Sequence, residues 1–110
     1  MSILVELAGI RAAAAEQAPF AYLLTVSDAS VTHLVAITPE FDGDEIVCAA
    51  GRSTCANAGA RPDVVLLWPP ARPDDFSLVV DGVARVDGDR VTIRPTHAVK
   101  HRPAPGLAPA

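Results

Sequence analysis

Hydrophobic and polar positions alternate along most of the chain in a pattern that predicts strands. Short runs of Val, Ile, Leu and Ala are separated by Asp, Gly, Ser and Pro. Such runs are typical of strands that bury at least one face, and such separators are typical of turns. Asp42-Gly43-Asp44 and Asp87-Gly88-Asp89 each predict a tight hairpin turn. The predicted strands are Ala21–Ser27, Thr32–Thr38, Glu45–Ala49, Val64–Trp68, Phe76–Val86 and Arg90–Arg94.

The N-terminal segment Ser2–Gln17 departs from this pattern and predicts a helix. Its apolar residues from Ile3 to Ala14 recur at helical spacing, and Pro19 follows them. A second, shorter helix is predicted at about Ser53–Ala60.

The stretch Gly51-Arg52-Ser53-Thr54 at the start of this short helix has two interpretations. Ser53 or Thr54 can cap the helix by accepting a hydrogen bond from a free backbone N–H. The same helix start, with the Arg52 guanidinium beside it, can hold an anion such as a phosphate. The residues alone leave both interpretations open.

Hairpin-connected strands with short helices predict one mainly β domain over residues 1–110, folded as a small closed antiparallel barrel of six strands. Both faces of Thr32–Thr38 are apolar, so we expect this strand to be covered on both sides. Gly82, in the middle of a long strand, predicts a bulge or a close backbone approach. The proline-rich segment from residue 96 to 110 is expected to leave the barrel as an extended tail.

The acidic balance of the chain argues against general nucleic-acid binding, which needs a basic face. The formal net charge is −4 and the isoelectric point is about 5.1. No apolar run reaches the roughly 18 residues of a transmembrane helix. The N-terminal residues also lack the basic region of a signal peptide. We therefore expect a cytoplasmic protein without a membrane partner.

Cysteine and histidine give weak signals for redox or metal chemistry. Cys48 lies in a predicted strand and is interpreted as a core residue, whereas Cys55 lies where a helix start could lower a thiol pKa. His97 and His101 have the spacing of a helical metal site, but the prolines around them disfavour a helix. No metal site is predicted.

The order of these features resembles the pyridoxamine 5′-phosphate oxidase-like family of split barrels. The match runs from about Thr32 to Val86, and no single motif in it is specific. The features that carry the resemblance are His33–Thr38, Asp42-Gly43, Gly51-Arg52-Ser53-Thr54, Asn57, Pro62, Leu66-Leu67-Trp68-Pro69-Pro70 and Val80-Asp81-Gly82-Val83-Ala84.

The resemblance implies a homodimer that binds flavin mononucleotide (FMN) at the subunit interface, and a flavin-dependent oxidoreductase of unknown substrate. It places the phosphate contacts on the second strand and in the turn before the inserted helix, and further cofactor contacts on the third strand and ahead of Gly82. The positions carried over are His33, Thr38, Val47, Cys48, Arg52, Ser53, Thr54 and Ser77.

The chain departs from the family's oxidases in ways that open alternatives. Those oxidases carry basic residues at several positions where this chain has His33, Thr38, Ser53 or Thr54. Their long C-terminal substrate-binding segment is also missing, so oxidation of pyridoxamine phosphate is not expected. The alternatives are a non-enzymatic barrel that has lost the cofactor, or a barrel for another ligand such as a deazaflavin or haem, with His33 as the available core histidine.

Overall fold

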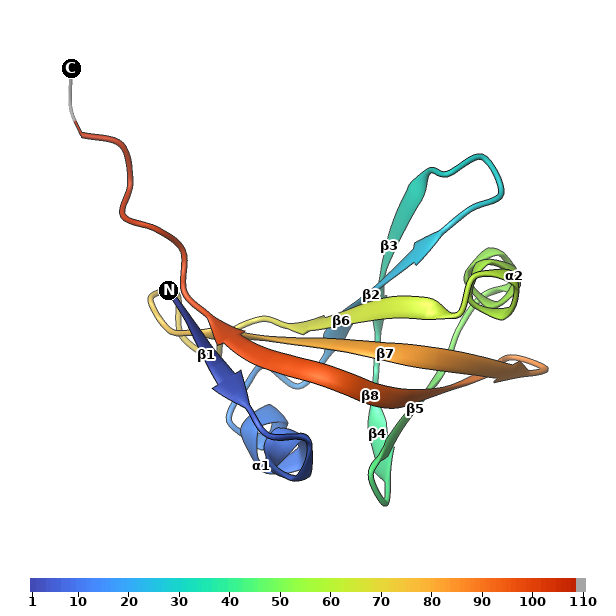
Figure 1. Cartoon of the computed structure of the whole chain (residues 1–110), viewed down its shortest axis with the longest axis horizontal. Helices are drawn as coiled ribbons and strands as arrows, with labels where there is room; N and C mark the ends of the chain where they lie inside the picture. Colours follow the sequence, from blue (N-terminus) through green and yellow to red (C-terminus); the bar gives the residue numbers. More distant parts are fainter. Residues whose placement is uncertain (109–110) are drawn as a thin grey trace.

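The computed structural model describes residues 1–108, which form a mainly β structure with two short α-helices and one 3-10 turn (Figure 1). The elements are β1 (Ser2–Val5), η1 (Leu7–Gly9), α1 (Ile10–Ala15), β2 (Ala21–Val26), β3 (Thr32–Ile37), β4 (Glu40–Asp42), β5 (Glu45–Ala49), α2 (Arg52–Ala60), β6 (Asp63–Trp68), β7 (Ser77–Asp87) and β8 (Arg90–His101).

The strands form one eight-stranded antiparallel sheet in the order β3-β2-β6-β7-β8-β5-β4. β8 is long enough to pair with three strands. It pairs with β7 along one edge, and with β5 and β1 along the other edge. Its first half pairs with β5, placing Ile93 opposite Ile46. Its second half pairs with β1, placing Val99 opposite Leu4.

The two outer strands of the sheet, β3 and β4, are consecutive in the chain. Only Thr38 and Pro39 separate them, and three residue steps span at most about 11 Å. The sheet must therefore curl until its edges approach each other, and Figure 1 shows β2 and β3 rising steeply from the layer of β6, β7 and β8. The mainly β, split-barrel prediction is confirmed, although two of the eight strands, β1 and β4, were not predicted.

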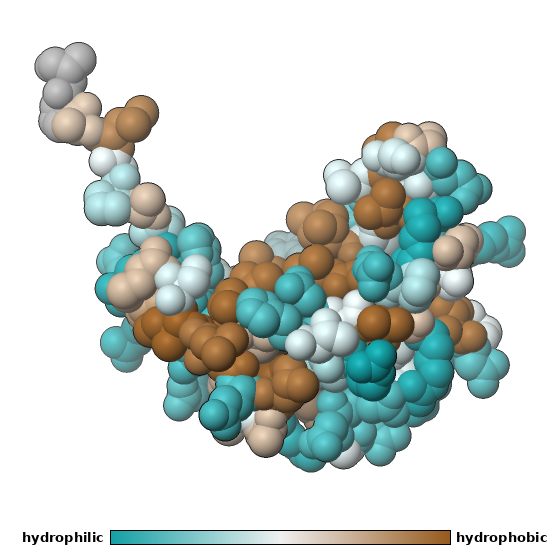
Figure 2. All heavy atoms as spheres, viewed as in Figure 1, coloured by the Kyte–Doolittle hydropathy of each residue, from teal (hydrophilic) through white to brown (hydrophobic). Residues whose placement is uncertain are grey.

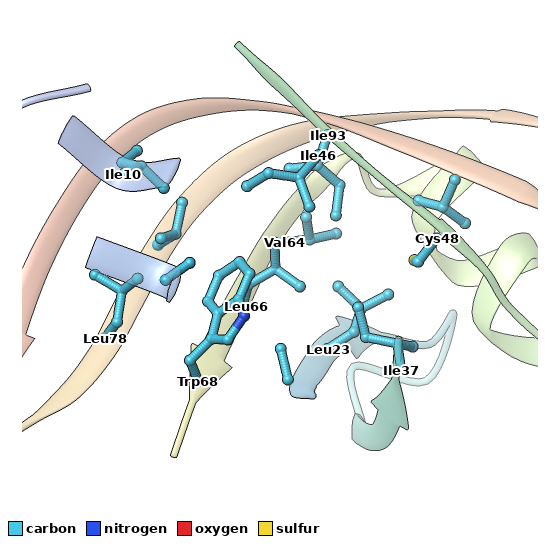
Figure 3. Packing of buried hydrophobic residues seen from close by; sticks show 14 of the residues in the cluster. Ile10, Leu23, Ile37, Ile46, Cys48, Val64, Leu66, Trp68, Leu78 and Ile93 are labelled. Carbon is cyan, nitrogen blue, oxygen red and sulfur yellow. The ribbon is translucent and has the colours of Figure 1, made fainter. Parts of the chain in front are cut away.

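The core lies inside this curl and continues under both helices. Leu23, Ile46, Leu66 and Ile93 are fully buried, and Figure 3 shows them converging from β2, β5, β6 and β8. α1 adds Ile10 to one end of the same cluster. α2 packs against β2 and β7 and adds Ala58. The helices thus extend a core that the sheet alone leaves open.

The predicted N-terminal helix is wrong over its first eight residues. Ser2–Val5 is β1, and Leu7–Gly9 forms η1 before α1 begins at Ile10. A four-residue segment has little helical stability of its own, and pairing with β8 supplies a ladder of interstrand hydrogen bonds. The pairing of Ser2–Val5 with the distant strand β8 therefore outweighs the helical periodicity that begins at Ile3.

The predicted end of the last strand at Arg94 is also wrong, because β8 continues to His101. Pro95, which lacks an N–H donor, lies opposite Gly82, where the register shifts between Asp81 and Gly82. A bulge there accommodates the proline without ending the pairing. The tail predicted from residue 96 starts only after β8: residues 102–108 are exposed and form no helix or strand, and Pro109 lies outside the described residues.

β3 is less covered than predicted. Within the described chain His33, Leu34 and Ala36 are exposed, and only Ile37 is buried. The hairpin predicted at Asp42-Gly43-Asp44 exists, but it joins β4 to β5 rather than β3 to β5. Gly43 supplies the positive φ of 60° that this turn needs.

Candidate functional site

An open pocket of about 400 Å³ lies between β5, the start of β8 and the segment that leads from β3 into β4. Three of its lining residues, Thr38, Val47 and Cys48, were predicted cofactor contacts. The complete lining is Thr38, Glu40, Val47, Cys48, Ala49, Asp89 and Arg90. The pocket therefore combines apolar, hydroxyl, thiol and charged groups within one ligand-sized space.

The pairing of β5 with β8 builds one wall of this pocket. Cys48 lies opposite Val91, and Ala49 lies opposite Arg90. The Ala50 N–H donates a 2.9 Å hydrogen bond to the Asp89 carbonyl, which ties the β7–β8 turn to the end of β5. Side chains more than 40 residues apart in sequence thus line one surface.

Both signs of charge meet at the pocket. The Glu40 and Asp89 carboxylates and the Arg90 guanidinium line it, and a guanidinium nitrogen of Arg90 lies 4.0 Å from an Asp42 carboxylate oxygen. Burial, with a smaller effect of nearby Cys55, raises the pKa of Cys48 to about 11. The Cys48 thiol is therefore neutral at physiological pH, and the charge of this wall comes from Glu40, Asp89 and Arg90.

The helix start next to this wall lacks a side-chain cap, which was one of the two interpretations of this stretch. Gly51, with extended φ and ψ, is the N-cap of α2, and no side chain caps the helix. Ser53 and Thr54 are residues of the helix itself, so their interpretation as N-caps is wrong. Arg52, the first residue of α2, is exposed, as is Ser53, whereas Thr54 is buried.

Cys55 does not have the activated thiol that a helix start could produce. Its Sγ donates to the Ala50 carbonyl over 3.4 Å. Burial, followed by the charge of Asp89, raises the pKa of this thiol rather than lowering it.

Five of the eight predicted site residues do not line the pocket: His33, Arg52, Ser53, Thr54 and Ser77. His33 is exposed on β3 opposite Thr25, five residues before Thr38, a separation of about 16 Å along a strand. Ser77 opens β7 opposite His101, ten residues from the β7–β8 turn. The structure thus gathers Thr38, Val47 and Cys48 beside the α2 start that carries Arg52, Ser53 and Thr54, and leaves His33 and Ser77 apart.

The sequence reasoning missed Glu40, Ala49, Asp89 and Arg90. Glu40 could have been found by strand alternation, because it follows Thr38 by two residues. Asp89 was assigned only to a hairpin turn and Arg90 only to the last strand, and placing them beside Ala49 requires the register of β5 on β8.

The described residues contain no cluster of three or more His, Cys, Asp or Glu side chains that could hold a metal ion. His97 and His101 lie on a strand rather than a helix, so four residues separate them by about 13 Å. His97 Nδ1 lies 3.5 Å from an Asp81 carboxylate oxygen, and His101 Nδ1 lies 3.2 Å from Ser2 Oγ. No helix within residues 1–108 is long and apolar enough to cross a membrane.

Comparison with known proteins gives relatives in mycobacteria. No family model matches the chain. Two proteins described as uncharacterized, from Mycobacterium bovis and Mycobacterium tuberculosis, are each 38% identical to it over 110 residues, covering 84% of this chain and 78% of the relative. The chain belongs to the family of these mycobacterial proteins.

Solved structures with the same fold include proteins whose names refer to F420, to pyridoxamine 5′-phosphate and to FAD. An F420 reductase superimposes with a TM-score of 0.62 at 20% identity, covering 76% of this chain and 90% of that one. A putative pyridoxamine 5′-phosphate oxidase from Listeria innocua gives 0.62 at 17% identity, covering 84% and 94%. A FAD binding protein from Mycobacterium smegmatis gives 0.65 at 15% identity, covering 93% and 100%. This chain thus has the split-barrel fold of these structures.

Proposed function

We propose that this split-barrel protein binds a flavin-type cofactor in the pocket between β5, β8 and Thr38, and that it is a flavin-dependent oxidoreductase. One observation carries the proposal. The family resemblance in the sequence assigned Thr38, Val47 and Cys48 to a cofactor, and these residues line one pocket of about 400 Å³. Pockets of this size are typical of small-molecule and cofactor sites.

The residues at the pocket fit the two ends of a flavin. Val47, Ala49 and the neutral thiol of Cys48 offer an apolar wall for a planar ring system. Arg90 in the pocket and Arg52 on the adjoining start of α2 offer guanidinium groups for a phosphate. The first backbone N–H groups of α2, which no side chain caps, are further donors for an anion.

The bound flavin would supply hydride or electron transfer, while the chain orients it and sets its electrostatic surroundings. FMN is the cofactor proposed first, because the resemblance found in the sequence implied it. The names of the structural neighbours make FAD and the deazaflavin F420 the alternatives to test beside it.

The proposal includes a homodimer with the cofactor at its interface. The pocket is open on one side. In a single subunit β3 exposes Leu34, and Val31, just before β3, is also exposed. A second subunit would cover such apolar surface and close the open side of the pocket.

A second candidate function is a barrel that binds a partner or another ligand without a flavin. The Glu40 and Asp89 carboxylates favour it, because they line the pocket and repel a phosphate dianion. Arg90 and Arg52 offset this repulsion only if both guanidinium groups reach the phosphate.

Titration of the purified protein with FMN, FAD and F420, followed by visible absorption after desalting, tests the proposal. Retention of about one cofactor per subunit supports it. A folded protein that retains none of the three contradicts it and favours the second candidate.

Variants locate the cofactor in the same titration. Arg52→Gln and Arg90→Gln are each expected to weaken FMN binding roughly tenfold, because each removes one charge-assisted phosphate contact. Arg72→Gln, in the exposed loop before β7, removes the same charge away from the pocket and is expected to leave binding unchanged. Equal effects of all three variants would contradict this placement of the phosphate.

A further inference from the structure

A second pocket, of about 260 Å³, lies on the opposite side of the segment that links β3 to β4. Thr38 and Glu40 face the first pocket, whereas Pro39 and Phe41 line the second. Alternation of side chains along one extended segment produces this division. The lining of the second pocket is Arg11, Ala14, Ala15, Ala18, Pro19, Pro39, Phe41 and Trp68.

Aromatic rings and one cation give this pocket a specific chemistry. Phe41 stacks on Trp68 with ring centroids 6.2 Å apart and an interplanar angle of 17°. The guanidinium carbon of Arg11 lies 5.9 Å from the Phe41 centroid, a cation–π distance. Alanine and proline side chains complete the walls, so Arg11 is the only charged group in the lining of this pocket.

The Arg11 guanidinium has no carboxylate within ion-pair distance among residues 1–108. Other arginines of the same chain do have one: Arg61 lies 2.7 Å from Asp28, and Arg85 lies 2.5 Å from Glu45. An adjoining hollow shares Arg11 and Phe41 and includes Asp44, but no ion pair forms between Arg11 and Asp44. Arg11 therefore offers its planar fork of donors to an added anion.

We propose that this second pocket binds a small planar aromatic carboxylate. The ring lies against Phe41 and the alanine and proline walls, and the carboxylate accepts paired hydrogen bonds from Arg11. The size is sufficient, because an apolar cavity of about 150 Å³ already holds a benzene ring. This ligand is separate from the proposed flavin, since the two pockets share no lining residue.

Trp68 allows a direct test, because it is the only tryptophan of the chain and lines this pocket. Its fluorescence is measured during titration of the full chain with benzoate, with acetate replaced by benzoate at constant ionic strength. We expect a saturable change in emission and heat on calorimetry. Benzamide, which lacks the charge, and cyclohexanecarboxylate, which lacks the planar ring, are each expected to bind at least fivefold more weakly.

Arg11→Gln assigns the charge to its residue. This variant is expected to bind benzoate at least tenfold more weakly with an unchanged melting temperature, because Arg11 is exposed. Arg72→Gln, an exposed arginine outside the pocket and without an ion pair among the described residues, serves as the matched control and is expected to bind as the original protein does.

Three results would overturn the proposal. The first is the absence of both a fluorescence change and heat with benzoate. The second is equal benzoate binding by the original protein and Arg11→Gln. The third is a shift from dimer to monomer in Arg11→Gln without any benzoate binding by the original protein, which would make this pocket a contact with a second copy.

Discussion

Gly82 is the residue at which the backbone leaves least room. A Cβ built at this position would lie 2.5 Å from Ile93 Cγ2 and 2.9 Å from the carbonyl oxygen of Arg94. The second contact is with backbone, so side-chain rotation cannot relieve it. This close approach lies at the bulge opposite Pro95, and β7 and β8 remain paired on both sides of that bulge.

We expect Gly82→Ala to lower the free energy of unfolding by about 2–3 kcal/mol, because it overpacks a strand pair at the centre of the sheet. Urea denaturation measures the loss. Gly59→Ala is the matched control: it lies within α2, its added Cβ would lie 3.9 Å from Val86, and helix propensity predicts a gain of up to about 1 kcal/mol. Equal effects of the two substitutions would refute the steric argument.

Cys48 couples stability to high pH through its buried thiol. Burial raises its pKa from 9.0 to about 11, so the unfolded chain loses this proton first as pH rises. The stability that the protonated thiol provides is present below pH 9 and is lost as pH rises towards 11. This pKa shift corresponds to a loss of about 2–3 kcal/mol in the free energy of unfolding.

Unfolding of the original protein and of Cys48→Ala at pH 8 and pH 10.5 isolates this effect from the other groups that titrate. Between the two pH values the free energy of unfolding is expected to fall by about 2 kcal/mol more in the original protein than in the variant. The same slope in both proteins would exclude Cys48 as its source.

Among the elements, α2 is fixed by a buried hydrogen bond that the sequence did not reveal. Asn57 Nδ2 donates to Thr25 Oγ1 on β2 over 3.2 Å, and both side chains are buried. Arg61 Nε adds a 2.6 Å bond to the Val26 carbonyl at the end of the same helix. Asn57 was one of the residues that carried the family resemblance, and its role here is to hold α2, and with it Arg52, against the sheet.

Thr25→Val is expected to cost about 1–3 kcal/mol of unfolding free energy, because it removes the acceptor and leaves the buried Asn57 amide donor without a partner. Thr25→Val combined with Asn57→Leu is expected to regain part of that loss, since neither polar group then remains. Denaturation of both single variants and the double variant gives the coupling energy. Additive losses would show that this bond does not hold α2 in place.

The sequence predicted elements well where their signals were local. β2, β6, β7 and α2 agree with prediction to within one or two residues, and both glycine turns are present. The strand β1 was not predicted because it pairs with residues 98–101, which lie far along the chain. The end of β8 was predicted too early because Pro95 is compatible with this strand only at the bulge opposite Gly82. Only the pairing of β7 with β8 reveals that register.

The same limit applies to the candidate site. Thr38, Val47 and Cys48 lie within eleven residues of the chain, and their assignment to a cofactor followed from a family resemblance. Asp89 and Arg90 reach the pocket only through the register of β5 on β8. The charge balance of the pocket, which bears on the choice of ligand, was therefore outside the reach of sequence reasoning.

At the scale of the whole molecule, the curled sheet leaves apolar surface that a second copy would cover. The sequence predicted β3 to be covered on both faces, yet Leu34 is 61% exposed, and Val31, just before β3, is 54% exposed. If β3 lies in an interface between subunits, its apolar side chains are exposed in a single subunit and covered in the dimer. The proposed homodimer accounts for both observations.

Sedimentation velocity at micromolar concentration tests this interface. We expect the original protein to be a dimer and Leu34→Lys to shift it towards monomer, because a charge buried in an apolar interface without a partner is costly. Leu107→Lys is the matched control, since Leu107 is 101% exposed on the tail. If the cofactor lies at the interface, Leu34→Lys also retains less FMN, although it is distant in sequence from Arg52 and Arg90. A monomeric original protein would contradict the homodimer, whereas a dimer insensitive to Leu34→Lys would place its interface elsewhere.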